Sequence, residues 1–490
     1  MRYELQWKRI WTQWFSSDLI YIFLIGLLSA VYLCNLNYNS PLTDEAIYIV
    51  LGKLGLFQWD WTSYGAGNWM AGSLYTYPPL TALAYTSFGI VGSRLLNVIF
   101  GLASVITVAA IAAELVPPRI AYTTRLATLF VFGFSGLSLL VSRLATYDMP
   151  AFYFFFLSFY ALIKAIHTQA FLGKWYFLSL VSLMLAIFMK VIILGYAPFL
   201  IALACYHALF KSPLRHRFYF WRYYLLPLSV IGLIYLIFQI PGLLVYFSTH
   251  RDTEIASYPE IIGSVSQYLL VLTPLWLIGT LLLLYFKRVY VWAAITLAAV
   301  WIIGLHAAAH RLATFDKHLY FTHAFVSILV GIGLAYLIDS PNSHFKPAIL
   351  VFVFIIIIPT LTLSAAWGFD YGQTWENTTG VSTYLQTVIK TGDYVLSAAG
   401  PASMLATYSL NHPLQTTTFD WFEYQGHEGA EAYSQAVKDA HFNYILLYKN
   451  IDQVNDSNQQ VQQIVESSRD NTYQPVYQDY AFIVYKREYL

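Results

Sequence analysis

Eleven long apolar runs, separated by polar segments, occupy the first three quarters of the chain. Each run approaches the roughly 20 apolar residues that a helix needs to cross the hydrocarbon core of a bilayer. The pattern predicts spans near residues 19–36, 93–113, 121–141, 150–167, 175–190, 191–210, 223–240, 263–286, 289–307, 318–338 and 347–366. The apolar stretch 79–91 is too short to span alone and predicts an interfacial helix before the second span.

The two ends of the chain have a different pattern. Residues 1–18 are too polar and too long for the start of a cleavable signal peptide, so the first run is expected to stay as a helix. In the polar tail 367–490, the apolar runs 393–399, 444–448 and 480–486 predict strands, and 379–390 and 429–440 predict helices. We therefore expect an all-α polytopic membrane domain, residues 1–366, with a long outer loop at 37–78. A small extracytoplasmic α/β domain, residues 367–490, follows it.

Composition supports the bilayer as solvent. Hydrophobic residues make up 58% of the 490 residues and charged residues only 11%, whereas about 25% is typical of soluble domains. The net charge of +1, without a basic stripe, argues against a nucleic-acid partner. Cys34 and Cys205, the two cysteines, both lie in apolar runs, which argues against a disulfide framework and against a cysteine metal site.

Lysine and arginine predict the orientation in the membrane. With the N-terminus in the cytoplasm, the inner segments hold 14 of these cations and the outer segments before the tail hold seven. We therefore expect a multi-pass cell-membrane protein whose N-terminus is cytoplasmic and whose C-terminal domain is outside.

Most of the acidic residues of the predicted membrane domain fall on the outer face. The first outer loop is long for a connector, and it carries the pair Asp44–Glu45 directly after Pro41 and Thr43. A helix start capped by Thr43, with both acids favoured by the helix dipole, explains the pair structurally. A general base at the membrane edge explains it functionally, because lost hydration makes a carboxylate more basic.

A second outer acid, Asp148, precedes Pro150 at the start of the fourth span. This position suits a helix N-cap. A carboxylate that caps a helix is also fixed in position by its hydrogen bond. Capping and catalysis are therefore compatible here.

Cations on the same face could neutralise a lipid phosphate. His250, Arg251, Lys317 and His318 lie in outer loops, and Lys190 lies in an apolar stretch, where a cation is costly and often functional. Snorkelling to the interface is the alternative for Lys190. His306, His310 and His318 could bind a metal, but no short metal motif surrounds them, so a divalent metal is not supported.

The order of these features resembles the GT-C membrane glycosyltransferases, in the branch of protein O-mannosyltransferases and lipid A aminoarabinose transferases. The resemblance spans about residues 18–340. Its segments are the Asp44–Glu45 loop, the Pro–Pro step YPPL (77–80), GSRLLNVIFGLASVITV (92–108), ATYDMPAFYFF (145–155), MKVIILGYAPFL (189–200) and FDKHLYFTHAFVSILVGIGLAYL (315–337).

The resemblance implies transfer of a sugar from a polyprenyl-phosphate donor to a hydroxyl of a glycan, lipid or protein acceptor, with inversion, at the outer face. It implies catalytic roles for Asp44, Glu45 and Asp148, with Asp44 as base, and donor-phosphate contacts from the cations named above. Tyr77 and Tyr320 lie in the matched segments and are candidate substrate-binding residues. The aminoarabinose branch has a lysine before the Pro–Pro step, where this chain has Tyr77.

Two other functions fit parts of the sequence. A transporter or lipid flippase would use a break near Lys190 and Gly195, although no inverted repeat is evident and the ionisable residues lie mostly at the outer edge. An assembly or sensor protein would use the tail, but this leaves the acidic loop unexplained. The transferase accounts for more of the residues, with the lipid-linked sugar as donor substrate and membrane lipids as surroundings. It assigns no cofactor and leaves a divalent metal open.

Overall fold

The structure, a computed structural model, describes residues 19–63, 66, 70–168, 171–249, 256–312, 314–339, 346–419, 422–449, 456–467 and 472–488. These residues form two compact units. The helical unit comprises the described parts of Met1–Leu36, Gly67–Ser73 and Arg94–Tyr371. The sheet unit comprises those of Asn37–Ala66, Leu74–Ser93 and Gly372–Leu490. Most of the first predicted loop is thus grouped with the tail.

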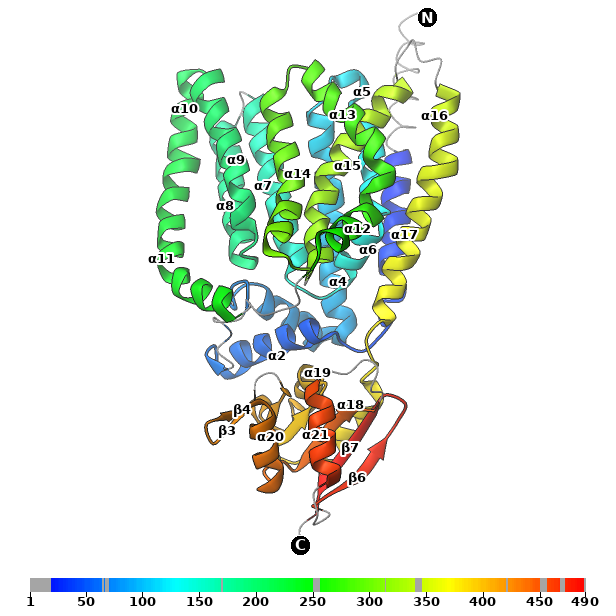
Figure 1. Ribbon diagram of the computed structural model, residues 1–490. Coiled ribbons are helices and arrows are strands. Elements are labelled where there is room, and N and C mark those ends of the chain that lie inside the picture. The colour runs from blue at the N-terminus through cyan, green and yellow to red at the C-terminus, as the bar shows by residue number, and fades with distance from the viewer. Residues whose placement is uncertain are drawn as a thin grey trace, which may run out of the picture. The chain divides into compact units, whose positions relative to one another are not determined.

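The helical unit is a bundle of helices running side by side (Figure 1). Its elements are the helix Leu19–Leu33, α4 (Tyr77–Glu114) from Arg94 onward, α5 (Pro118–Gly133), α6 (Gly136–Arg143), α7 (Asp148–His167), α8 (Leu172–Met189), α9 (Ile193–Tyr206), α10 (Leu214–Phe220), α11 (Leu226–Thr249), α12 (Tyr258–Leu269), α13 (Thr273–Tyr285), α14 (Val289–Ala309), α15 (Phe315–Asp339), α16 (Lys346–Phe352) and α17 (Ile358–Asp370).

Among the described residues, nine helices are long and apolar enough to cross a membrane. A tenth span arises if α5 and α6, bent by 66° at their junction, are counted together. The first predicted run, 19–36, coincides with Leu19–Leu33, a shorter apolar helix. The prediction of a polytopic helical membrane protein is therefore confirmed, and the bend between α5 and α6 is a feature that hydropathy did not show.

The predicted interfacial helix at 79–91 is the first part of α4. The helix is interrupted at Phe88 and Gly89, and Gly89 has a φ of +61°. This left-handed conformation is strained for residues with a side chain and available to glycine, so Gly89 lets the chain turn before the span continues.

Helix α15 lies at the centre of the helical unit, and 83% of its most apolar segment is buried. It packs against α5, α13 and α14, and its sequence is apolar on nearly all faces, as expected for a surrounded helix. Glycines permit the close approach. A Cβ on Gly279 of α13 would lie 1.9 Å from the Leu329 carbonyl oxygen of α15.

Two buried arginines hold the end of the first helix. Arg94 Nη1 donates to the Leu36 carbonyl at 2.9 Å, and Arg143 Nη2 donates to those of Cys34 and Asn35 at 2.8 and 2.9 Å. These three carbonyls lie in the turn directly after the helix Leu19–Leu33, at the negative end of its dipole, where cationic donors are favoured. Both arginines therefore have a structural role.

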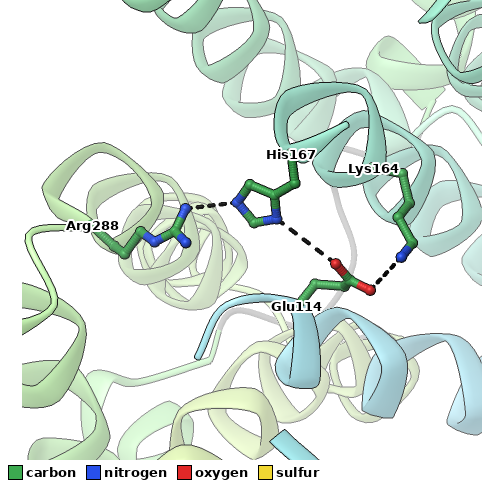
Figure 2. A network of polar contacts seen from close by, with 4 residues as sticks. All are labelled: Glu114, Lys164, His167 and Arg288. Atoms are coloured by element: carbon green, nitrogen blue, oxygen red, sulfur yellow. Dashed lines mark hydrogen bonds and ion pairs between the residues drawn. The ribbon is translucent and has the colours of Figure 1, made fainter. Parts of the chain in front are cut away.

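A polar network lies at the C-terminal end of α7 and links it to α4 and to the start of α14 (Figure 2). Glu114 of α4 bonds Lys164 at 2.5 Å and lies 3.8 Å from His167 Nδ1. Arg288, before α14, lies 2.6 Å from His167 Nε2. Because an arginine can only donate, Nε2 of His167 accepts, and Nδ1 carries the proton that faces Glu114.

The sheet unit contains a five-stranded sheet of order β2-β1-β5-β7-β6 and a hairpin of β3 and β4. The pairs β1–β2 and β1–β5 are parallel, and β5–β7 and β6–β7 are antiparallel. The elements are α2 (Thr43–Gln58), α18 (Thr379–Val388), β1 (Val395–Ser397), α19 (Gly400–Thr407), β2 (Thr416–Thr417), β3 (Glu423–Tyr424), β4 (His427–Glu428), α20 (Gly429–Lys438), β5 (Tyr444–Tyr448), α21 (Asp456–Ser467), β6 (Tyr473–Gln478) and β7 (Phe482–Arg487).

Every strand and helix predicted in the tail is present. Strands β2, β3, β4 and β6 and helices α19 and α21 were not predicted. Strands β2, β3 and β4 have only two residues each, and β6 has an exposed, polar pattern interrupted by Pro475. Helix α19 packs against α2, which brings part of the first predicted loop into this unit.

The contact between α13 and α15 gives a stability prediction. Gly279→Val should lower the free energy of unfolding by about 1–3 kcal/mol, because the new side chain must displace the α15 backbone. Gly304→Val on α14 is the matched control, since a Cβ there meets no atom within 4 Å. Thermal unfolding in detergent should show a lower midpoint for Gly279→Val only; equal midpoints for both variants would contradict this packing.

Candidate active site

The helical unit holds a buried ion pair between Asp148 and Lys190. Asp148 is the first residue of α7, and Lys190 follows the last residue of α8. Each residue is only 5% exposed. The Asp148 side chain does not cap α7, since Tyr147 occupies the N-cap position, and its carboxylate bonds the Lys190 ammonium instead. Lys190 is therefore paired inside the protein and does not snorkel.

A short segment of the first predicted loop fixes the backbone around Lys190. Ser73 N donates to the Phe188 carbonyl at 2.7 Å, and Val191 N donates to the Ala71 carbonyl at 2.9 Å. Between them, a Cβ on Gly72 would lie 2.2 Å from the Met189 carbonyl oxygen. Only glycine permits this approach without a shift, so Gly72 helps to position Lys190. Sequence reasoning missed this role; the only signal was a glycine within a long loop.

His306, near the end of α14, and His318, near the start of α15, lie next to each other. His306 Nδ1 lies 2.8 Å from the Arg311 carbonyl oxygen, and its Nε2 lies 2.9 Å from His318 Nδ1. A carbonyl only accepts, so Nδ1 of His306 carries a proton. While His306 is neutral, its Nε2 accepts from His318 Nδ1, which leaves a lone pair on Nε2 of His318.

The ion pair and the histidines form one electrostatic cluster. Lys190 and Lys317 both act on the Asp148 carboxylate. His318 lies within electrostatic range of Lys190, Lys317 and Asp148. With neutral histidines, two ammonium groups and one carboxylate give the cluster of Asp148, Lys190, Lys317, His306 and His318 a net charge of +1. An anion is therefore the ligand that this cluster favours.

In the sheet unit, Glu45 has a structural partner. Its Oε2 accepts from the Leu42 backbone N–H at 2.9 Å, and the residue is fully buried. Leu42, rather than Thr43, is the N-cap residue of α2, so the expected threonine cap is replaced by this glutamate contact. Asp44, half-buried, lies in the same first turn, where the positive end of the helix dipole favours a carboxylate.

The chain before Asp44 is pinned to the segment that follows α17. Asn39 Nδ2 donates to the Gly372 and Trp375 carbonyls at 3.1 and 2.9 Å. Ser40 Oγ accepts from Thr378 N at 2.9 Å, and its carbonyl accepts from Trp375 Nε1 at 3.0 Å. The start of α2 is thus fixed by polar contacts far away in sequence, which no local pattern revealed.

Lys53, on α2, is engaged by aromatic rings. Its ammonium lies 5.2 Å from the Tyr85 ring centroid and 4.5 Å from that of Tyr408. Burial lowers the pKa of Lys53. These contacts hold α2 against α19 and give the lysine a packing role.

The remaining candidates divide by environment. Tyr77 is fully buried and packs edge-on against Tyr48 at 6.1 Å between ring centroids. Tyr320 is 1% exposed and packs against Phe132 and Phe152 in the core. His250 and Arg251 lie outside the described residues. No group of three or more His, Cys, Asp or Glu side chains placed to hold a metal occurs in the described part of the chain.

Solved structures with the same fold cover almost the whole chain. ArnT from Cupriavidus metallidurans in the apo state matches with a TM-score of 0.60 and 11% identity, over 96% of this chain and 98% of that one. The same protein bound to undecaprenyl phosphate matches with a TM-score of 0.58 and 12% identity, over 95% and 97%. An oligosaccharyltransferase from Archaeoglobus fulgidus in the apo form matches with a TM-score of 0.56 and 12% identity, over 87% and 69%.

No family model and no curated protein matches the sequence. The structural matches define the class: this chain has the fold of the GT-C membrane glycosyltransferases. The resemblance seen in the order of sequence motifs is confirmed at the level of the fold.

The Asp148–Lys190 pair gives a test by double-mutant cycle. Asp148→Asn or Lys190→Met alone should each destabilise the protein by about 3–5 kcal/mol, because each leaves one buried charge without its partner. The double variant should recover most of that loss, since neither charge of the pair remains. Thermal unfolding of the four proteins measures the coupling; strictly additive losses would show that the two side chains do not interact.

Proposed function

We propose that this protein transfers a sugar from a polyprenyl-phosphate donor to a hydroxyl acceptor at the outer membrane face, with inversion at the anomeric carbon. The observation that carries the proposal is the cationic cluster around the Asp148–Lys190 pair, in a chain with the GT-C fold. ArnT of Cupriavidus metallidurans has been solved with undecaprenyl phosphate, and AglB of Archaeoglobus fulgidus with a dolichol phosphate. Both support a lipid-linked donor.

The cluster suits the departing phosphate. When the bond between the anomeric carbon and the phosphate oxygen breaks, that oxygen gains negative charge. Lys317 and Lys190 supply fixed positive charge in a site of low hydration, where electrostatic stabilisation is strongest. His318 lies within electrostatic range of both lysines and remains a candidate phosphate contact. Asp148 holds Lys190 in place and limits the net charge.

The acceptor needs a base. We assign this role to Asp44, whose carboxylate takes the proton of the acceptor hydroxyl while the hydroxyl oxygen bonds to the anomeric carbon. Glu45 is assigned a positioning role, because its contact with Leu42 N fixes the first turn of α2. A single displacement of this kind inverts the anomeric centre and releases the polyprenyl phosphate. Arg251 and His250 remain candidate phosphate contacts, and Tyr77 and Tyr320 remain candidate substrate contacts.

Transport or lipid flipping is the alternative. The bend between α5 and α6 is the feature that favours it, because interrupted spans are common in transporters. The transferase is preferred because the cationic cluster lies at helix ends rather than mid-span. Movement of a labelled polyprenyl-phosphate sugar across liposomes, without a covalent product, would establish the alternative.

Asp44 and Glu45 offer a matched pair of variants. Asp44→Asn should reduce transfer from a fluorescent polyprenyl-phosphate sugar by about 100-fold or more, because the amide cannot take a proton. Glu45→Gln should cost much less, since its amide oxygen can still accept from Leu42 N. Initial rates of product formation with a panel of hydroxyl acceptors measure both variants in detergent-purified protein.

Unchanged donor binding in Asp44→Asn is the control that separates a lost base from a misfolded site. Full activity in Asp44→Asn would rule out its role as the base. Equal and complete losses in both variants would contradict the separation of catalytic and positioning roles.

A further inference from the structure

The helical unit contains a second site, lined by residues outside the cationic cluster. It is a cavity of about 280 Å³, and its polar lining includes Ser135, Gln267, Tyr268, His323, Thr360 and Ser364. Its apolar lining includes Leu361, Leu363 and Trp367. Among the described residues that line it, none carries a lysine, arginine, aspartate or glutamate side chain. The cavity is therefore suited to a neutral ligand and poorly suited to a phosphate.

His323 points to a ligand in this cavity. It is 2% exposed, and neither ring nitrogen meets hydrogen-bond geometry with any described residue, although the Val131 backbone lies nearby. His323 is the ninth residue of α15, about 12 Å along the helix from its start. A buried imidazole whose ring nitrogens lack a well-formed hydrogen bond is costly at membrane depth, and such residues are usually functional.

The break between α5 and α6 supplies the polar wall. Ser135 caps α6 by accepting from Ser138 N at 3.2 Å, and Ser364 Oγ accepts from Gly136 N at 2.8 Å. Irregular backbone at membrane depth is tolerated where it is buried in protein or lines a cavity. Here the 66° bend places hydroxyl groups in the cavity wall beside His323.

The cavity has an apolar margin toward the lipid. Leu363 of α17 is 73% exposed, and α17 belongs to a membrane-spanning segment, so this residue faces the hydrocarbon. Tyr268 packs against Trp367 at 5.3 Å between ring centroids, and its hydroxyl donates to Asp316 at 3.4 Å. A ligand would thus enter past Leu363 with an apolar chain and place a polar group beside His323.

We propose that this cavity binds a neutral lipid alcohol, with its hydroxyl group hydrogen-bonded to His323 and its hydrocarbon chain along Leu361 and Leu363. A neutral imidazole presents one donor and one acceptor, and a hydroxyl group is the smallest group that answers both. This site is separate from the proposed transfer reaction. Binding there requires neither the sugar donor nor the sugar acceptor, and it does not depend on catalytic activity.

The test is photolabelling of the full chain in nanodiscs with a diazirine analogue of dodecanol. Labelled peptides should come from α15 around His323 and from α17 around Leu363, and excess dodecanol should compete. His323→Phe should reduce this labelling by about tenfold, as expected for loss of one well-placed hydrogen-bonding group. His323→Asn, which keeps a donor and an acceptor, should retain part of it.

Controls separate binding from folding and from general lipid contact. Phe238→Leu, at an exposed position of α11, should leave the labelling unchanged. His323→Phe should keep the monodisperse profile and thermal midpoint of the parent, since it removes an unsatisfied polar group. Three results would overturn the proposal: equal labelling by the hydroxyl-free dodecane analogue, stronger labelling by the dodecyl phosphate analogue, or no labelling at all, which would mean that the cavity holds water.

Discussion

A lysine and an aspartate that are buried together impose the main constraint on this protein. Removing either charge from water costs several kcal/mol, and the cost is offset only while the two remain in contact. Contact requires α7 to begin where α8 ends, and it requires the span to break at Lys190 before α9 starts. The backbone bonds of Ala71 and Ser73 hold that break open. Local structure, packing and charge therefore depend on one another at this point.

Two sets of charged residues in the helical unit have different roles. Arg94, Arg143 and the network of Glu114, Lys164, His167 and Arg288 tie helix ends together. The cluster around Lys190 adds Lys317 and His318, so it holds more positive than negative charge. Among the described residues, this excess positive charge makes the cluster the candidate site for an anionic substrate. The arginines and the Glu114 network have a structural role at the helix ends.

Hydropathy predicted the helices well, because each run of apolar residues near span length has few other ways to satisfy its backbone. It did not predict the bend between α5 and α6, since the sequence FVFGFSGLSLLVSR stays largely apolar through the bend. In the tail, β1, β5 and β7 were predicted from buried apolar runs, while the exposed edge strand β6 was not.

The sequence could identify candidate site residues one at a time, but it could not show which of them contact each other. A lysine in an apolar stretch and an aspartate before a span were visible in sequence, but their pairing over 42 positions was not. The roles of Gly72, Asn39 and Ser40 depend on contacts with distant backbone, so no local pattern marked them. The sequence predicted a helix start at Thr43 with Glu45 in its first turn, but it did not show that Glu45 accepts from Leu42 N.

The most direct test of the central claim is an experimental structure of the protein in nanodiscs with a polyprenyl phosphate bound. The account predicts phosphate density in contact with Lys317 and His318, with the Asp148–Lys190 pair still formed beside it. Phosphate bound elsewhere, with the cluster unchanged and empty, would contradict the claim that this buried pair organises the donor site.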